Sequence, residues 1–492
     1  MLHGMKRALG ILALAVLVFA AVLLVRAATL RSVQLTVPPA PRIELADPAV
    51  IVERLAAAIR IPTISHQDPS QDDPAVFQEF RDHLERSFPM LHATLKREIV
   101  NERSLVYTWA GRDPSKAGVI LMAHQDVVPV EPGTEANWQQ PPFSGAIADG
   151  FIWGRGTIDT KGKLLATFEA VEALLRDGFQ PTRTIFLVSG HDEEVGGRDG
   201  ALVIAKRWEA AGTRFEWVLD EGGAIGQGLV PGVAAPAALI GIAEKGYVTL
   251  SLTASADGGH SSMPPPHTAI GILASAIERV EAHPLPASLQ GATRQFLGAL
   301  GPEMEFPMRV VVANSDLLEP LLLRALGASP RSNATIRTTT AVTMVQGGIK
   351  ENALPASARA LVNFRILPGD TVQGVIEYVR RVVDDPRVTV ALLEGSHALD
   401  PSPESRSDSE PFALLTRTIR ETHPDTIVAP NLVLGGTDAR YFHSLSENVY
   451  RFGPLHMGPD DLKRAHGTNE RVGVDDYLDS VRFYIRLLQN AG

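Results

Sequence analysis

The chain has 492 residues, 45% of them hydrophobic and 21% charged, so it is long enough for two or three units with sizeable cores. Its formal net charge is −10, and no block of lysine or arginine occurs beyond the N-terminus, which argues against a nucleic-acid partner. The absence of cysteine excludes disulfides, thiolate metal sites and a cysteine nucleophile, but it assigns no compartment.

The N-terminal segment is predicted to be one membrane-spanning helix. Residues 8–25 carry no charge, and about 17–25 apolar residues suffice to span a bilayer. Lys6 and Arg7 precede this stretch, which favours a cytoplasmic N-terminus and a globular part on the non-cytoplasmic side. Secretion after signal cleavage is the alternative, because Ala20-Ala21 and Ala27-Ala28 permit cleavage, although a signal peptide usually has only about 7–15 apolar residues.

Two patterns of elements follow the anchor. Strand-like and helix-like stretches alternate from about Asp47 to Glu244, which predicts a doubly wound α/β domain. From Tyr247 the order is strand, helix, an insertion, two strands, helix and strand, which suggests an inserted α+β, ferredoxin-like lid. The predicted organisation is an anchor or signal segment (1–30), a linker (31–46), the first part of the α/β domain (47–245), the lid (246–397) and the second part of the α/β domain (398–492).

The insertion, residues 284–333, is rich in leucine between residues 317 and 326. We expect one amphipathic helix that packs on the lid. The alternative is an apolar surface that admits long acyl chains.

Polar side chains follow several of the apolar runs. His124 and Asp126 come two residues apart after such a run, so on a strand they would point to the same face. Asp159 lies in a glycine-rich turn before a helix-like stretch, where it could be a ligand or a helix N-cap. Glu193 and Glu194 follow the next run, as ligand and base or as components of a solvated acidic loop.

Two further candidates complete the set. Asp220 ends another apolar run, and His466 lies in a loop far downstream. In open parallel sheets, sites form outside the carboxyl ends of the strands. Histidines and carboxylates without cysteine suit zinc or a similar divalent ion, and a shared carboxylate would make a two-metal hydrolytic site.

Taken together, these motifs resemble those of the dinuclear zinc peptidases of the carboxypeptidase S, aminoacylase and glutamate carboxypeptidase type. The similarity is closest to the carboxypeptidase S (Gly-Xaa carboxypeptidase) branch and covers roughly residues 47 to 490. The segments that carry it, in the family's order, are residues 122–130, 138–145, 154–162, 191–197, 219–223, 259–264 and 435–440, with His466.

The resemblance implies two zinc ions per chain and a role for each candidate ligand. It implies that His124 and Asp220 bind one ion and that Glu194 and His466 bind the other. It also implies that Asp159 bridges the two ions.

The same resemblance assigns the catalytic groups and the substrate pocket. Glu193 is expected to be the general base, Asp126 to orient the His124 ring, and His260 to stabilise the oxyanion, often from the neighbouring subunit. Arg365 is expected to hold the substrate's free carboxylate, in a pocket lined by Asn352, Gly436 and Thr437. Without the resemblance, Arg365 is an ordinary strand-end arginine and His260 a loop histidine.

The predicted function is a zinc carboxypeptidase that hydrolyses the amide next to a free C-terminal carboxylate in short peptides. The alternative is an N-acyl or N-fatty-acyl amino acid hydrolase with the same site. A membrane-anchored binding module is a third hypothesis, and Glu193 together with five metal ligands argues against it. Expected partners are the peptide or N-acyl amino acid substrate, the membrane through the N-terminal helix, and a second copy of the chain through the lid.

Overall fold

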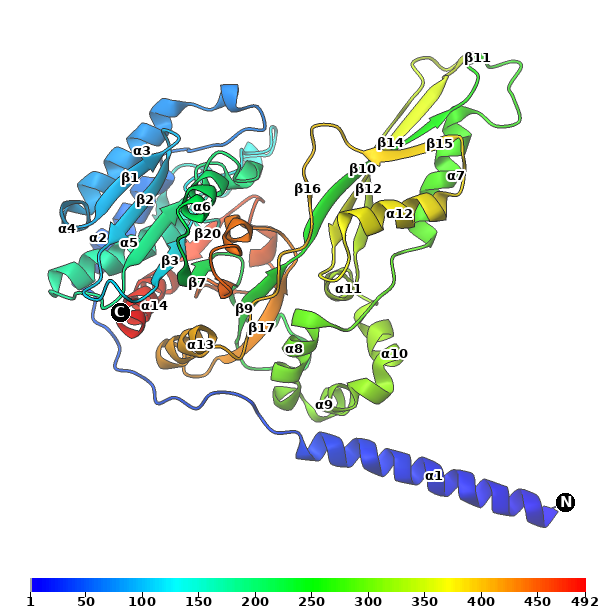
Figure 1. Ribbon diagram of the computed structural model, residues 1–492, viewed down its shortest axis with the longest axis horizontal. Helices are drawn as coiled ribbons and strands as arrows, with labels where there is room; N and C mark the ends of the chain where they lie inside the picture. Colours follow the sequence, from blue (N-terminus) through cyan, green and yellow to red (C-terminus); the bar gives the residue numbers. More distant parts are fainter. Residues whose placement is uncertain (1) are drawn as a thin grey trace.

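A mixed ten-stranded β-sheet lies at the centre of the larger of two units (Figure 1). The computed structural model describes residues 2–492, with side chains from residue 4 onward. In sheet order the strands are β1 (Lys96–Val100), β2 (Ser104–Trp109), β6 (Ile185–Ser189), β3 (Gly118–Met122), β7 (Phe215–Asp220), β18 (Val449–Arg451), β9 (Ala237–Glu244), β8 (Ile225–Gly226) and β19 (His456–Met457), with β17 (Ile427–Val433) paired to β9.

The middle of this sheet is parallel and buried on both faces. Strand β3 pairs parallel with both β6 and β7, and β7 pairs parallel with β18. Strands β1, β2 and β6 pair antiparallel, so the sheet is mixed. Every residue of β9 is buried. Parallel strands covered on both faces are typically continuous apolar runs, and this explains why β3 and β7 show little alternation in the sequence.

Helices cover both faces of the sheet. One face packs against α2 (Pro48–Ile59), α5 (Lys161–Arg176) and α14 (Val474–Ala491) in the main apolar core. The other face packs against α6 (Ala201–Ala210) and the short helical turn η5 (Asp438–Phe442). Also on this unit are α3 (Pro74–Ser87), α4 (Pro89–Thr94) and α13 (Glu410–Thr422), and a small sheet of β4 (Ala146–Ala148), β5 (Phe151–Trp153) and β20 (Arg471–Gly473). The predicted α/β class is confirmed, with a mixed sheet.

The smaller unit is an antiparallel sheet that projects away from the larger one (Figure 1). Its strands, in order, are β12 (Thr339–Gly347), β14 (Ser357–Ile366), β10 (Gly246–Ser255) and β15 (Val388–Leu392), with β16 (Ala398–Leu399) also paired to β10. Alternate side chains of β14 are buried, as expected for a sheet with one covered face. The covering helices are α7 (Ala269–Ala282) and α12 (Val372–Val383).

The insertion differs from the single helix on the lid that we expected. It forms α8 (Gly291–Leu300), α9 (Phe306–Ala313), α10 (Ser315–Leu326) and α11 (Pro330–Ile336). Pro302, Pro307 and Pro320 interrupt the helical pattern, because proline cannot continue a helix without a kink or a new start. Apolar side chains of α8, α9 and α10 pack against β9 and β17, so the insertion is attached to the larger unit.

Helix α1 (Leu2–Thr29) has one end beside α9 and projects from there with its N-terminal end (Figure 1). Its stretch from Gly4 to Thr29 is long and apolar enough to cross a membrane, with a mean hydropathy of 3.1 in its most apolar window. This finding fits either a signal sequence or a single membrane span.

Candidate metal centre and active site

The candidate site lies where three neighbouring strands of the larger sheet end. His124 follows β3, Glu193 and Glu194 follow β6 in a short helical turn, and Glu221 follows β7. These strands are adjacent and parallel, so their carboxyl ends meet at one edge of the sheet. Asp159 reaches the same point from the turn before α5.

Two groups of donor atoms meet at this edge. The first contains His124, Glu193 and Glu221, and the second contains His124, Asp159 and Glu194. Within each group, one donor atom from every residue lies within 4.8 Å of the others. His124 Nε2 lies 3.0 Å from Asp159 Oδ1 and 3.4 Å from Glu221 Oε1.

The carboxylate of Asp159 lies between two histidines. Its Oδ1 faces His124, and its Oδ2 lies 2.9 Å from His466 Nε2. The same His466 nitrogen lies 3.1 Å from Glu194 Oε2. The loop after β19 therefore brings His466 to the strand ends, and Asp159 presents one oxygen to each side of the centre.

The electrostatics of the centre favour a bound cation. Burial, together with the nearby Asp159 carboxylate, raises the pKa of Glu221 to about 7. Hydrogen bonds to Asp159 and Glu194 raise the pKa of His466 to about 10. Burial lowers the pKa of His124, but Glu221 and the other nearby carboxylates more than offset this effect and raise it well above the usual value.

The raised pKa values reflect carboxylates that lie close together and repel one another when ionised. In the absence of a cation, bound protons reduce this repulsion. Among the described residues, the buried Glu194 Oε1 has no hydrogen-bond partner. Nitrogen and carboxylate oxygen donors with a free buried oxygen fit a divalent metal ion such as zinc, which would replace the protons.

Glu193 projects toward the same space. Its Oε2 lies 3.9 Å from His124 Nε2. Burial, together with the carboxylates of Glu221, Asp438 and Glu194, raises the pKa of Glu193 well above the ordinary value, against the opposing effect of His124. The adjacent Glu193 and Glu194 face different histidines, His124 and His466.

Asp126 lies directly behind His124. His124 Nδ1 lies 2.9 Å from the Asp126 backbone oxygen and 3.3 Å from its carboxylate Oδ1. The carboxylate also accepts hydrogen bonds from the Ser65 hydroxyl, at 2.6 Å, and from the backbone N–H groups of Glu193 and Glu194, at 3.3 and 3.1 Å. Asp126 therefore positions the histidine ring and the loop that carries the two glutamates.

The structure departs from the sequence-based expectation at Asp220. Both oxygens of this buried carboxylate accept backbone hydrogen bonds, from Glu221 N–H at 2.9 Å and Ala439 N–H at 2.8 Å. Glu221, the next residue, faces His124 instead. Asp220 is the last residue of β7, and adjacent residues at a strand end point in opposite directions. Only Asp220 is expected as a ligand from the sequence, whereas the carboxylate one residue later is the one that faces His124.

Sequence reasoning also missed Glu470, which supports the turn that carries Asp159. Its buried Oε1 accepts hydrogen bonds from the N–H groups of Gly156, Ile158 and Asp159, at 2.9, 2.9 and 3.1 Å. Its Oε2 lies 2.5 Å from Arg155 Nη1. In the sequence, Glu470 follows His466 by four residues, and nothing there distinguishes it from an ordinary loop glutamate.

The residues predicted to bind substrate fall into two places. Arg365 stacks over the Tyr247 ring at 4.8 Å, near the point where β14 and β10 meet the larger unit. Thr437 donates hydrogen bonds to Glu244 through its N–H and hydroxyl, at 3.1 and 2.6 Å, in the loop that also holds Asp220. Gly436 lies in this loop, against the side chain of Arg440.

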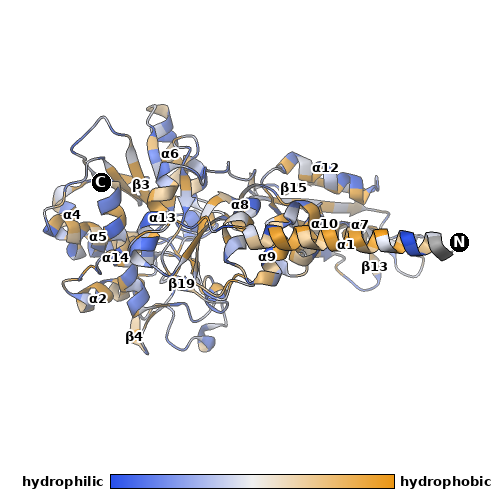
Figure 2. Cartoon of the chain, turned by 90° about the horizontal axis from the view of Figure 1, so that it is seen from below, coloured by the Kyte–Doolittle hydropathy of each residue, from blue (hydrophilic) through white to orange (hydrophobic). Residues whose placement is uncertain are grey.

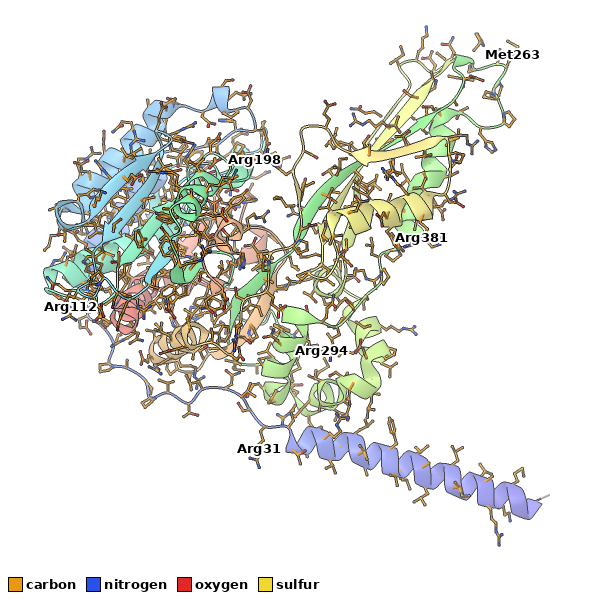
Figure 3. The ribbon with its side chains drawn as sticks, viewed as in Figure 1. Arg31, Arg112, Arg198, Met263, Arg294 and Arg381 are labelled. Carbon is orange, nitrogen blue, oxygen red and sulfur yellow. The ribbon has the colours of Figure 1, made fainter. Side chains whose placement is uncertain are left out.

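His260 and Asn352 lie together at the far tip of the smaller unit, so Asn352 does not share a pocket with Arg365 in one chain. His260 is in β11 (Gly259–His260), which pairs with β13 (Ala353–Leu354), and the Asn352 carbonyl accepts a hydrogen bond from Ser261 N–H at 3.1 Å. Both side chains are exposed. Met263 marks this tip in Figure 3, far from the strand ends that carry His124.

A cavity of about 260 Å³ opens beside Asp159 and Glu221. Its walls are largely apolar and include Leu229, Leu239, Leu455, Met457 and Leu462. Lys163 also lines the cavity, and among the described residues its buried Nζ has no hydrogen-bond partner. Burial lowers the pKa of Lys163 to about 8, against the opposing effect of Asp220 and Glu221.

Comparison with known proteins defines the class. The model of Peptidase family M20/M25/M40 matches residues 120–490, and the chain belongs to this family. Among the solved structures, the fold is similar to that of an M20 family metallo-carboxypeptidase, Sso-CP2 from Sulfolobus solfataricus, with a TM-score of 0.67 and 18% identity over 90% of this chain and 99% of that one. Human carnosine dipeptidase 1 has a TM-score of 0.64, with 16% identity over 90% of this chain and 96% of that one.

The curated relatives refine the branch. The chain is 39% identical to the N-fatty-acyl-amino acid synthase/hydrolase PM20D1 of Xenopus tropicalis, over 90% of this chain and 86% of that one. It is 40% identical to the probable carboxypeptidase S-like 2 of Dictyostelium discoideum, over 89% and 85%, and 35% identical to carboxypeptidase S of Saccharomyces cerevisiae, over 91% and 85%. The predicted resemblance to the carboxypeptidase S branch is confirmed, and the protein is a hydrolase of the metallopeptidase class.

Proposed function

We propose that the protein is a dinuclear zinc hydrolase that cleaves the amide bond next to a free carboxylate. The observation that carries this proposal is the position of Asp159, which presents one oxygen to His124 and the other to His466. In this assignment His124 and Glu221 would hold one ion and Glu194 and His466 would hold the other, with Asp159 shared between them. Asp220 positions the loop that follows β7.

Glu193 is the proposed general base. When bound, the two zinc ions supply Lewis acidity and lower the pKa of a water from about 15.7 towards neutrality. Glu193 accepts a proton from the attacking water and returns it to the departing amine nitrogen. Its position supports this role, because Glu193 Oε2 lies 3.9 Å from His124 Nε2, beside the donor atoms that would hold the metal.

Arg365 is the proposed anchor for the substrate's free carboxylate. A guanidinium group can bind a carboxylate through two parallel hydrogen bonds. Two other basic residues lie near it, because repulsion from Arg440 helps to lower the pKa of Arg365 after burial, and Arg365 in turn helps to lower the pKa of Lys245. Arg440 is ion-paired with Glu244 at 3.1 Å, and Lys245 Nζ donates hydrogen bonds to two backbone carbonyls, so Arg365 is the basic group of the three that is best placed to bind an anionic group of the substrate.

Two substrate classes remain for the other side of the scissile amide. The leading candidate is a short peptide, in keeping with the carboxypeptidase S relatives. The second is an N-acyl amino acid, in keeping with the relatives named N-fatty-acyl-amino acid synthase/hydrolase. The apolar cavity beside Asp159 and Glu221 favours this second class, because an acyl chain would be removed from water against Leu229, Met457 and Leu462.

His260 is proposed to act in the site of a second copy. Its exposed position at the far tip of the smaller unit leaves it outside the centre of its own chain. Strand β12 forms an edge of the smaller sheet and exposes Met344 and Val345, so it could pair with the same strand of a partner. In this arrangement the smaller unit, residues 246–397, is both lid and dimerisation domain.

We further propose that α1 remains as a single-pass anchor, with the catalytic domain on the non-cytoplasmic side. Its uncharged stretch, Ala8 to Val25, is longer than the apolar region of a usual signal peptide. The basic residues Lys6 and Arg7 before it favour a cytoplasmic N-terminus.

Metal analysis combined with a substrate panel tests the proposed activity. Mass spectrometry of the purified protein should find close to two zinc ions per chain, and a chelator should abolish hydrolysis. A dipeptide series compared with N-acetyl- and N-oleoyl-amino acids should then separate the two substrate classes. A protein that hydrolyses either class at full rate without metal would refute the proposed centre.

A further inference from the structure

The C-terminal end of α1 is packed against the insertion helices rather than free. Ala20, Leu23 and Arg26 are half-buried, Ala27 is fully buried, and Leu30 is again half-buried. These positions recur every three or four residues, so they form one stripe along the helix. In Figures 1 and 2 the same end of α1 lies beside α9 and α10.

Polar contacts fix this junction. Asn314, the residue between α9 and α10, is buried and donates a hydrogen bond from Nδ2 to the Leu23 carbonyl at 3.0 Å. Arg26 forms an ion pair with Asp316, at 3.0 Å, in the first turn of α10. The point at which α1 leaves the body is therefore set by α9 and α10.

The depth of this junction follows from the length of α1. The uncharged stretch from Ala8 to Val25 has a rise of about 27 Å at 1.5 Å per residue, close to the hydrocarbon thickness of about 30 Å. In a spanning helix that lies along the membrane normal, this whole uncharged stretch would lie in the hydrocarbon layer. Leu23 would then lie about 3 Å from the membrane boundary, with Ala20 deeper. The residues of α9 and α10 that contact this stripe would lie at the boundary as well.

Helices α9 and α10 carry apolar side chains on their outer surface at this position. Phe306 and Leu317 are each 48% exposed, and Leu321 is 63% exposed. Other positions of the same helices face the protein: Met308 lies beside Gly232, and Val312 and Leu322 are buried against the larger unit. A helix pair with one apolar side in the core and another on the surface is suited to an interfacial position in a membrane.

We propose that Phe306, Leu317 and Leu321 form a membrane-docking surface, with the lipid bilayer as its partner, beside the exit point of α1. This inference rests on the proposed anchor role of α1 and goes beyond it, because an anchor alone leaves the body free to move above the membrane. Docking through α9 and α10 holds the body against the bilayer, and the bilayer removes the three apolar side chains from water.

The same surface lies close to the catalytic cavity. Val230 and Val233 pack in one apolar cluster with residues of the insertion, namely Met304, Val312 and Leu322. Leu229, which precedes Val230, lines the cavity beside Asp159. Only the loop that follows β8 therefore separates the docking helices from the cavity. A substrate with an apolar tail would have a short path from the bilayer to this side of the site.

Fluorescence quenching on the full-length chain tests the docking surface. The chain contains no cysteine, so a single introduced cysteine gives one labelling position. Four variants, Leu14→Cys in α1, Phe306→Cys, Leu321→Cys and Met90→Cys, are labelled with an environment-sensitive fluorophore. They are then reconstituted into phosphatidylcholine vesicles that contain a doxyl-labelled phosphatidylcholine. Met90 is the matched control, because it is an exposed apolar residue, 39% accessible, on α4 at the opposite end of the larger unit.

Docking predicts that the doxyl lipid quenches the labels at Leu14, Phe306 and Leu321 and leaves the label at Met90 bright. Quenching at Leu14 alone would retain the anchor and overturn the docking surface. Equal quenching at Met90 and Leu321 would also overturn it, because the contact would then be non-specific. An unquenched Leu14 label would overturn the anchor and this inference with it, whereas zinc content and hydrolysis in the same samples would report separately on the catalytic proposal.

Discussion

Replacing each of the two carboxylates at the end of β7 by its amide should distinguish the metal ligand, Glu221, from the residue that positions the loop, Asp220. In Glu221→Gln, a neutral amide replaces the carboxylate that lies 3.4 Å from His124 Nε2. In Asp220→Asn, the side chain keeps its shape, but one of the two oxygens that accept backbone N–H bonds becomes an NH₂ group. The two variants differ by one position in the sequence and remove the same charge, so each is the control for the other.

The expected magnitudes differ because the contacts differ. Asp220→Asn leaves one backbone N–H without an acceptor, at a cost of about 1–3 kcal/mol in the free energy of unfolding. Loss of a supporting group typically lowers metal affinity by about 10–100-fold, or about 1.4–2.7 kcal/mol. Glu221→Gln removes a direct charged ligand, so one of the two ions should be lost altogether while the other stays with His466, Glu194 and Asp159.

Zinc titration by isothermal calorimetry, with metal content measured after dialysis, distinguishes these outcomes. We expect a stoichiometry near one ion per chain for Glu221→Gln, and near two for Asp220→Asn with one weakened site. Thermal unfolding of the metal-free variants should show the larger loss for Asp220→Asn. If Asp220→Asn instead lost an ion and Glu221→Gln kept both, the ligand would be Asp220, and the orientation of the two side chains at the end of β7 would be wrong.

Three other predictions concern the same centre. Glu193→Gln should keep both ions and lose about 10²–10⁴-fold or more in turnover, whereas Glu194→Gln should lose metal. Equal metal loss in both variants would show that the base and ligand roles of the two glutamates are wrongly assigned. Arg365→Ala should reduce kcat/KM for substrates with a free carboxylate far more than for their amides, and equal losses would exclude it from carboxylate binding. In the metal-free protein, the stabilisation that Glu221 and His466 provide should fall as the pH rises from about 5 to 9, because their pKa values are raised to about 7 and about 10 and the folded state holds protons that the unfolded state releases. Buried Lys161, Lys163 and Lys245 have lowered pKa values and act in the opposite direction, so the effect is measured as the difference in stability from the Glu221→Gln and His466→Ala variants. Thermal unfolding of the three metal-free proteins should show this difference decreasing with pH, and a difference that grows with pH would contradict the assigned shifts.

Residues next to strand ends were predictable because burial leaves a clear sequence pattern. The apolar run before His124 and the run before Glu193 become β3 and β6, and their parallel pairing brings the two residues together. The choice between Asp220 and Glu221 was not predictable in the same way. A shift of one residue at a strand end reverses the direction of every side chain, and the sequence pattern does not locate strand ends that accurately.

Contacts between residues far apart in the sequence were the hardest to predict from the sequence. Glu470 and Arg155 are 315 residues apart, and no local pattern links them. His260 lies in a short hairpin whose distance from the centre depends on the length and direction of β10 and β14. In the insertion, leucine spacing indicated one helix, but the prolines divide it, and the resulting helices pack on β9 and β17.

The place of β18 in the larger sheet has a consequence for biosynthesis. This strand, Val449–Arg451, lies between β7 and β9 and pairs with both. Residue 451 is synthesised 231 residues after Asp220, about 10–50 s later at 5–20 residues per second. Until then the edges of β7 and β9 lack this partner, and the centre lacks His466. A nascent chain can complete neither the sheet nor the metal centre before its last tenth has emerged, so chaperones that shield open strand edges should bind the nascent chain during that interval.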